Sequence, residues 1–327
     1  MKSVLLTGAS GFLGSHLARS FIEGGWRVRA ASRRPADGQA TNPDLEWVGV
    51  GEIGRHTEWG PLLEGVDVVV HAAAVAHRIS KKDQVPASVY DEVNHRGTER
   101  LAECARRAGV GRFVLISSIG AVADACDVVI DESTPCAPTT AYGRSKLAAE
   151  IALADRLTGS ACEWCVLRPP LLYGPGHSGN MGRLLRLIQL PLPLPFGAIH
   201  NRRSFMYVGN LVSAVQLVTT HPAAGGQVFC VADAETLSTR QLIEALGRAS
   251  GRRIWMIDAS LPALQRIGRL GDAIGAWTGQ SPGFDSESVR KLCGSLSLSS
   301  AHIRERCGWE PPVRLADGLS ATMVRHA

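Results

Sequence analysis

Tyr142 and Lys146 stand four residues apart, a spacing that places both side chains on one face of a helix. An ammonium group beside a phenol favours the phenolate, so the pair predicts a tyrosine whose pKa is lowered toward the working pH. Such a tyrosine can remove a proton from a hydroxyl group as hydride leaves carbon, or donate one to a ketone in the reverse direction. The spacing by itself is common on helices and indicates little.

The position of Ser118 supports a chemical role for the Tyr142–Lys146 pair. It follows an apolar run that is typical of a strand, Arg112–Ser117, and precedes a predicted helix at Tyr142–Leu157. Because the carboxyl ends of parallel strands meet at one ligand crevice, we expect Ser118 to reach the same oxygen as Tyr142.

A glycine-rich segment, Thr7–Gly14, lies between a predicted strand at Ser3–Thr7 and a predicted helix at Gly14–Glu23. Gly8 permits a tight turn, Gly11 lets the backbone approach phosphate groups, and Gly14 lets the helix pack closely on the strand. The helix N-terminus then offers N–H groups and a partial positive charge to an anion. This pattern predicts the pyrophosphate site of a dinucleotide, with further contacts from Ser10, Phe12 and Leu13. A P-loop is excluded, because no lysine directly follows a glycine in this sequence.

The end of the second predicted strand, Arg27–Ala31, bears on the choice of cofactor. NAD-specific folds usually place a carboxylate there for the ribose 2′-hydroxyl. Here Ser32, Arg33 and Arg34 follow, and the first carboxylate is Asp37. A 2′-phosphate would suit Ser32 and Arg33, so NADP is favoured over NAD, although arginines that are merely solvated at a strand end would leave NAD open.

The remaining elements alternate in type. Predicted strands at Val66–His71, Glu163–Arg168 and Gln227–Val231 are interspersed with predicted helices at Asn94–Ala108 and Asn210–Thr219. Alternation of this kind predicts an α/β fold, a Rossmann-type doubly wound parallel sheet. Proline and glycine cluster after Arg168, which indicates a smaller C-terminal substrate-binding lobe. We expect residues 1–168 plus about 205–234 to form the dinucleotide-binding domain, and about 169–204 plus 235–327 the lobe.

The composition excludes several classes of protein. A chain of 327 residues is long enough for two lobes, and its net charge of +5 is spread without the basic stripe that nucleic acid requires. No apolar run approaches the roughly 18 residues of a membrane span. The first apolar run is too short for a signal peptide, so we expect a cytoplasmic protein with its eight cysteines reduced. Cys162 and Cys165 have CxxC spacing but no second pair, so we expect structural thiols and no metal site.

Taken together, these motifs resemble the extended short-chain dehydrogenase/reductases of the nucleotide-sugar, NAD-dependent epimerase/dehydratase family. The resemblance covers nearly the whole chain, and its motifs are Thr7–Gly14, residues 71–74, Asn94 with Gly97 and Thr98, Ser117 and Ser118, Tyr142 with Lys146, Arg168 with Pro169, residues 173–175 and residues 203–210.

The resemblance implies a role for each of these positions. Ser118, Tyr142 and Lys146 would be the catalytic triad, Asn94 would order the active-site helix, Phe196 would lie near the uracil and Arg203 would bind the diphosphate of a UDP-sugar. The other predicted cofactor contacts are Glu52, Ile53, Ala72, Ala73, Ala74, Ser117 and Pro169, together with Asn94, Tyr142 and Lys146. This family often dimerises through the helices that carry Asn94 and Tyr142, so a homodimer is expected.

Departures from the family pattern narrow the reaction. Dehydratases of this family place Asp-Glu directly after the catalytic Ser or Thr, whereas Ile119 and Gly120 follow Ser118 here and cannot do acid/base work. Leu171 replaces the usual substrate-lobe asparagine, so we assign that phosphate-side role to Asn180, which could instead cap a helix at Met181–Ile188. Asn210 fits an N-cap.

The chain most resembles bacterial O-antigen enzymes that act on UDP-4-keto-6-deoxy-N-acetylhexosamines, notably 4-reductases. The leading hypothesis is therefore hydride transfer at C4 of a UDP-hexose by a 4-keto-reductase. A UDP-sugar 4-epimerase with tightly bound NAD is the alternative. A non-catalytic dinucleotide sensor on the same fold is a remote one, because such sensors typically lose the Tyr or Lys.

Overall fold

The computed structural model describes residues 1–33, 42–76, 85–177, 180–189, 192–278 and 285–323. Its larger sheet has seven strands, all parallel, in the order β10-β7-β5-β4-β1-β2-β3. These strands are β1 (Ser3–Thr7), β2 (Arg27–Ser32), β3 (Leu45–Gly49), β4 (Val68–His71), β5 (Arg112–Ile116), β7 (Glu163–Arg168) and β10 (Gln227–Cys230). The predicted doubly wound parallel sheet is confirmed.

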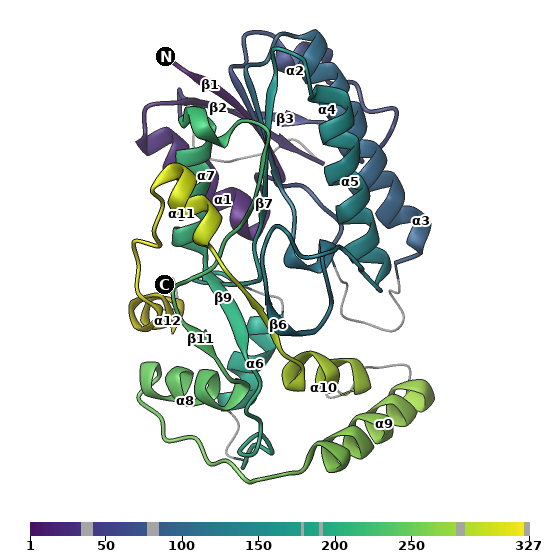
Figure 1. The fold of residues 1–327 in the computed structure, drawn as a ribbon, viewed down its shortest axis with the longest axis vertical. Helices are drawn as coiled ribbons and strands as arrows, with labels where there is room; N and C mark the ends of the chain where they lie inside the picture. The colour runs from purple at the N-terminus through teal and green to yellow at the C-terminus, as the bar shows by residue number, and fades with distance from the viewer. Residues whose placement is uncertain (34–41, 77–84, 178–179, 190–191, 279–284, 324–327) are drawn as a thin grey trace.

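Helices cover both faces of this sheet (Figure 1). On one face α1 (Phe12–Glu23) packs beside α7 (Val208–Thr220), and on the other α4 (Gly97–Arg107) packs beside α5 (Ala141–Leu157). Each layer encloses its own apolar core against the central strands, which are buried on both sides. Shorter segments complete the layers: α2 (Gly60–Leu63), α3 (Ala87–Tyr90), the π-helix η2 (Asp91–Arg96), the 3₁₀ turns η3 (Ile119–Ala121) and η4 (Pro222–Ala224), and α11 (Ala301–Cys307).

A second sheet lies at the other end of the molecule, in the order β11-β9-β12-β6, with β8 paired to β9. Its strands are β6 (Cys126–Ile130), β8 (Leu171–Tyr173), β9 (Arg203–Tyr207), β11 (Thr236–Leu237) and β12 (Leu296–Leu298). Around it lie α6 (Asn180–Gln189), α8 (Thr239–Ala249), α9 (Leu261–Thr278), α10 (Ser286–Cys293) and α12 (Leu315–Met323). A separate apolar core holds these elements together. The division into domains at residues 168, 205 and 234 stays a prediction, and β6 joins the second sheet although it comes from the first half of the chain.

One predicted helix start is wrong. The helix α7 begins at Val208, two residues before Asn210, and Asn210 is buried inside its first turn. The Nδ2 of Asn210 donates to Asp233 (2.7 Å) and to the carbonyl of Val313 (2.8 Å), and its Oδ1 accepts from the Val313 N–H. The amide therefore satisfies a distant loop, which sequence spacing alone could not reveal.

Candidate active site

The glycine-rich turn after β1 forms a cradle at the carboxyl edge of the large sheet. Gly8 has φ +70°, and a Cβ there would lie 2.8 Å from the backbone nitrogen of Ala73. A Cβ on Gly14 would lie 2.0 Å from the Gly8 carbonyl oxygen, so this helix start tolerates only glycine. The N-cap of α1 is Gly11, which offers no side-chain capping bond, and no acidic residue occupies the first turn. The first-turn N–H groups are thus available to an anion, which fits a pyrophosphate.

The floor of the cradle is a buried hydrogen-bonded chain that sequence reasoning missed. The Oγ1 of Thr7 meets Nδ1 of His71 at 2.7 Å, and Nε2 of His71 meets Oγ1 of Thr98 at 3.1 Å. Burial, followed by the nearby charge of Lys146, lowers the pKa of His71 to about 3. The neutral imidazole thus ties β1 and β4 to α4. Ala73, whose N–H donates to Thr7 (3.1 Å), continues this chain toward the cradle.

The helix α5 is fixed at its start by a capped N-terminus. Oγ1 of Thr140 accepts from the Gly143 N–H (3.1 Å), and Asp124 accepts from the backbone and hydroxyl of both Thr139 and Thr140. Burial tends to raise the pKa of Asp124, but these hydrogen bonds leave it below its usual value. Gly143 allows the first turn to approach η3 closely, since a Cβ there would lie 2.3 Å from the Gly120 carbonyl oxygen. These contacts hold the N-terminus of α5 close to η3.

That close approach brings Tyr142 to Ser118. The two hydroxyls are hydrogen-bonded, and Gly120 lies beside both side chains. The predicted lowering of the Tyr142 pKa does not appear in the structure. Burial raises the pKa of Tyr142, and the bond from Ser118 offsets that rise only in part. The reason is geometric: the ammonium of Lys146 donates to the carbonyl of Ile116 (2.7 Å), at the end of β5.

Lys146 sits above a buried acidic network. Burial lowers the pKa of Lys146 to about 8, and the carboxylate of Glu150, one turn further along α5, acts in the opposite direction. Glu150 accepts a short hydrogen bond from Ser117, and Arg168 binds it through Nε (3.1 Å) and Nη2 (2.6 Å). Both members of this ion pair are buried. The network therefore joins the buried face of α5 to the ends of β5 and β7.

Asn94 fixes the other side of α5. It lies in the π-helix η2, where its Oδ1 accepts from the Val75 N–H (2.8 Å). Its Nδ2 donates to the Val75 carbonyl (3.0 Å) and to Oγ of Ser145 (3.0 Å). π-helical turns are rare in proteins, and those that occur are often found at functional sites. Asn94 therefore ties η2 and the segment after β4 to α5 at Ser145.

Comparison with known proteins places this geometry in a family. Residues 4–232 match the model of the NAD dependent epimerase/dehydratase family. The UDP-glucose 4-epimerase of Vibrio cholerae is 34% identical over 98% of this chain and 94% of its own length. The N-acetyl-alpha-D-glucosaminyl-diphospho-ditrans,octacis-undecaprenol 4-epimerase of Escherichia coli O157:H7 is 28% identical, with 98% and 94% covered.

The chain belongs to the NAD dependent epimerase/dehydratase family. It is therefore a nicotinamide-dependent enzyme of the extended short-chain dehydrogenase/reductase type, as the sequence motifs predict. A solved structure of MoeE5 in complex with UDP-glucuronic acid and NAD has the same fold, with a TM-score of 0.75 at 24% identity over 98% of this chain and 97% of that one. NAD is the cofactor bound in that neighbour, and the comparison does not distinguish NAD from NADP for this chain.

The residues predicted to contact the 2′ position of the adenosine ribose begin at the end of β2, where the structure describes Ser32 and Arg33. Ser32 is buried at the end of β2 and Arg33 is exposed beside it. Arg34 and Asp37, which also entered the prediction, lie outside the described residues.

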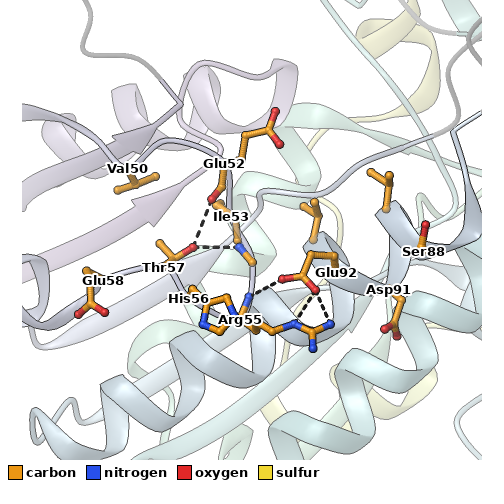
Figure 2. A pocket seen from close by; sticks show the side chains of 13 residues that line it. Val50, Glu52, Ile53, Arg55, His56, Thr57, Glu58, Ser88, Asp91 and Glu92 are labelled. Carbon is orange, nitrogen blue, oxygen red and sulfur yellow. Dashed lines mark hydrogen bonds and ion pairs between the residues drawn. The ribbon is translucent and has the colours of Figure 1, made fainter.

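Glu52 and Ile53 lie in the segment after β3, at the edge of a pocket of about 780 Å³. Figure 2 shows the ion pair of Arg55 with Glu92 (2.7 Å) joining this segment to η2, while the Glu52 carboxylate points away from that pair. Ile53 packs against the start of α4 at Gly97. The residues lining this pocket come from 50–58 and 88–93 and include none of Ser118, Tyr142 and Lys146, so the pocket is distinct from the cluster of those three residues.

Three residues predicted to contact the substrate, Phe196, Arg203 and Asn180, lie in different surroundings. Phe196 is fully buried in the core of the second sheet's layer, so a base could stack on its ring only if that core opened. Nη1 of Arg203 donates to the carbonyls of Lys291 and Gly294 at the end of α10, and burial lowers the pKa of its guanidinium. Asn180 begins α6, and its side chain lies outside the described residues.

Two further positions complete the candidate site. Pro169 is buried, and its carbonyl accepts from the Ile119 N–H (2.9 Å), which holds η3 against the end of β7. His177 was missed from the sequence: its ring meets Phe12 of the glycine-rich turn edge-on at 4.8 Å. Nδ1 of His177 is buried without a hydrogen-bond partner among the described residues. The only sequence signal for it was its place directly after the Gly174–Gly176 turn.

The described ranges contain no group of three or more His, Cys, Asp or Glu side chains able to hold a metal ion, and none of their helices has the length and apolar character of a membrane span. All eight cysteines are unpaired. Burial raises the pKa of Cys162 to about 12 and that of Cys165 further, in agreement with structural thiols.

Proposed function

We propose that this enzyme transfers hydride at C4 of a UDP-hexose. The observation that carries the proposal is the hydrogen-bonded Ser118–Tyr142 pair, held beside a buried Lys146 at the same sheet edge as the glycine cradle. The names of the Vibrio cholerae and Escherichia coli relatives, both 4-epimerases, support chemistry at this carbon.

Each residue of the pair has a role in the reduction of a C4 ketone. The hydroxyl of Ser118 donates to the ketone oxygen and polarises the C=O bond. Tyr142 gives its proton to that oxygen as C4 becomes an alcohol carbon, and the raised pKa of the phenol keeps this proton available at neutral pH. Lys146 stabilises the phenolate that results, once its ammonium leaves the Ile116 carbonyl. When bound in the cradle, the reduced nicotinamide supplies the hydride.

Among C4 reactions, reduction of a 4-keto-6-deoxy-N-acetylhexose is favoured, as a step in making sugars for bacterial surface polysaccharide. Ser32 and Arg33 at the end of β2 suit the 2′-phosphate of NADP, an exchangeable cofactor that a reductase consumes. Ile119 and Gly120, which carry no acid or base, disfavour dehydration. The second candidate is 4-epimerisation with retained NAD, and the names of the two relatives favour it.

One assay separates the two candidates. The purified chain is incubated with UDP-4-keto-6-deoxy-N-acetylglucosamine and either NADPH or NADH, and the ultraviolet absorbance of the reduced nicotinamide is followed. The reductase proposal predicts consumption of the cofactor, faster with NADPH. No consumption with either cofactor, together with interconversion of UDP-N-acetylglucosamine and UDP-N-acetylgalactosamine, would establish the epimerase instead.

The remaining assignments are part of the same proposal. The cradle and Ala72–Ala74 bind the cofactor, Arg203 binds the substrate diphosphate after α10 releases its guanidinium, and Asn180 or His177 contacts the phosphate side. Residues 1–168 plus about 205–234 act as the dinucleotide-binding domain. The chain works in the cytoplasm as a homodimer joined through α4 and α5, where Ile151 is exposed on the outer face of α5.

A further inference from the structure

The helix α9 (Leu261–Thr278) is oriented with its small residues inward and its large apolar residues outward. Its buried positions are Leu264, Gly268, Gly271 and Gly275. Its outward face carries a stripe at helical spacing, here called the α9 stripe, made of Ile267, Leu270, Ile274 and Trp277. These four side chains are between 43% and 89% exposed.

Packing against α10 fixes which side of α9 faces inward. The glycine side of α9 lies against α10, so closely that a Cβ on Gly268 would come within 3.0 Å of the Ser286 Cα. A larger residue at Gly268 would push Ser286 away, so rotating the helix to bury its stripe against α10 is disfavoured. A soluble helix usually shows the reverse pattern, with a stripe of large apolar residues facing the core.

The segment just before α9 has the same character. Trp255 is 74% exposed and Ile257 is 53% exposed. Both follow α8, in the link that leads to α9 at the end of the molecule farthest from the large sheet (Figure 1). Exposed apolar patches of this kind, rimmed by polar residues, mark interaction sites with protein or lipid.

The charges around these residues decide between those partners. Residues 252–278 contain four arginines, Arg252, Arg253, Arg266 and Arg269, all exposed, against the two aspartates Asp258 and Asp272. Arg266 lies at the edge of the α9 stripe by helical spacing. Basic residues beside an outward apolar stripe, with tryptophan at its end, are the pattern of a helix that lies in the plane of a membrane interface.

We propose that the α9 stripe, with Trp255 and the neighbouring arginines, docks the enzyme on the surface of an anionic lipid bilayer. Ile267, Leu270, Ile274 and Trp277 enter the boundary between headgroups and acyl chains, while the arginines stay among the lipid phosphates. A second copy of this chain fits the surface less well. A two-fold contact of α9 with α9 would bring the arginines of both copies into one interface, where like charges repel.

The test is cosedimentation of the purified full chain with vesicles of phosphatidylcholine mixed with phosphatidylglycerol, against vesicles of phosphatidylcholine alone. We expect binding to the mixed vesicles that weakens as salt is added, because headgroup attraction is screened. The double variant Leu270→Ser/Ile274→Ser should bind at least about tenfold more weakly, because apolar burial in the bilayer is lost. Arg266→Gln/Arg269→Gln should lose the preference for phosphatidylglycerol.

A matched control is the double variant Val128→Ser/Val129→Ser, which removes two exposed valines from β6. It should bind vesicles like the unaltered chain, and all three variants should keep their far-ultraviolet circular dichroism and their activity on dissolved substrate. Equal vesicle binding by the α9 variants and the unaltered chain would overturn the proposal. So would sedimentation showing that the α9 substitutions split a dimer, which would make this face a protein interface.

Vesicle binding is measured without substrate or cofactor. Its failure would therefore leave the proposed C4 reaction untouched, and a failure of that reaction would not affect the vesicle result.

Discussion

Two long helices of this enzyme depart from ordinary amphipathic design in opposite directions. The helix α5 turns Lys146 and Glu150 inward, where both are buried, and the helix α9 turns leucine, isoleucine and tryptophan outward. The free-energy cost of each departure is offset in a different way. The buried charges of α5 are matched by Arg168, Ser117 and the Ile116 carbonyl. For the exposed face of α9 we propose a remedy outside the chain, the lipid surface.

The buried charges of α5 indicate where function lies in this fold. Burying a charge costs free energy that only hydrogen bonds and an opposite charge offset, so a buried Lys above a buried Glu is a feature that folding alone would not favour. Local departures of this kind are expected at functional sites. Substitutions in the two helices distinguish a functional role of the inward charges and the outward apolar residues from a role in stability.

The largest effect is expected at Tyr142. Tyr142→Phe removes the proton donor, so kcat for ketone reduction should fall by about 10²–10⁴-fold, while the fold stays intact. Tyr207→Phe, which removes a phenol on β9 and leaves the Ser118–Tyr142 pair intact, is the matched control and should keep its kcat. Full activity of Tyr142→Phe on the substrate would mean that α5 carries its buried charges for another reason.

Glu150→Gln tests the positioning network on the buried face of α5. Because it leaves Arg168 buried without its counter-charge, the free energy of unfolding should fall by about 3 kcal/mol. The Glu150 carboxylate also raises the Lys146 pKa, so its removal should lower that pKa and shift the alkaline limb of the kcat profile to lower pH. Glu103→Gln on α4, whose partner Arg107 is largely exposed, should cost less than about 1 kcal/mol and shift no limb. An unshifted limb in Glu150→Gln would show that Glu150 is structural only.

Lys146→Met should inactivate the enzyme and stabilise it. The Lys146 pKa is lowered from 10.5 to about 8, so between these values the unfolded chain binds a proton that the folded chain does not. The penalty of burying the ammonium is therefore complete below pH 8 and disappears as the pH rises to 10.5. Chemical unfolding should show a gain on the order of 2 kcal/mol at neutral pH that shrinks through this window. A gain independent of pH would contradict the account, and Lys291→Met, with a partly exposed ammonium, serves as the control.

The smallest effects separate the two sides of α9. Gly268→Val pushes a side chain into Ser286 of α10 and should lower the free energy of unfolding by about 1–3 kcal/mol. Ile274→Ser, on the outward face, should change it by less than about 0.5 kcal/mol. Thermal and urea unfolding of the two variants measure this difference. A large loss of stability in Ile274→Ser would mean that the stripe packs against the chain in solution.

The parallel sheet and the proximity of Ser118 to Tyr142 were predictable because their signals are local. The strand–glycine–helix order at residues 3–23 and the spacing of Tyr142 and Lys146 each arise from a few neighbouring residues. The networks behind them were not predictable. Glu150 is one helical turn after Lys146, a visible spacing, but its partner Arg168 comes from another strand and meets it only through the sheet order.

The substrate side was less predictable for a related reason. The burial of Phe196 and the bond of Arg203 to the end of α10 depend on how residues 169–204 pack against 235–323, which no periodic pattern encodes. Asn210 shows the same limit, since its partners Asp233 and Val313 lie far along the chain. The outward apolar face of α9 was not predictable either. An apolar helical period indicates a core-facing side, and only the fold shows which side is buried.

Hydride transfer to C4 is tested most directly with NADPH that carries deuterium at the transferable position, incubated with the enzyme and UDP-4-keto-6-deoxy-N-acetylglucosamine. Proton and deuterium NMR of the product then locate the label. The account predicts deuterium at C4 of the sugar, present with the unaltered enzyme and strongly reduced with Tyr142→Phe. Deuterium at another carbon, or a product formed without deuterium, would contradict it.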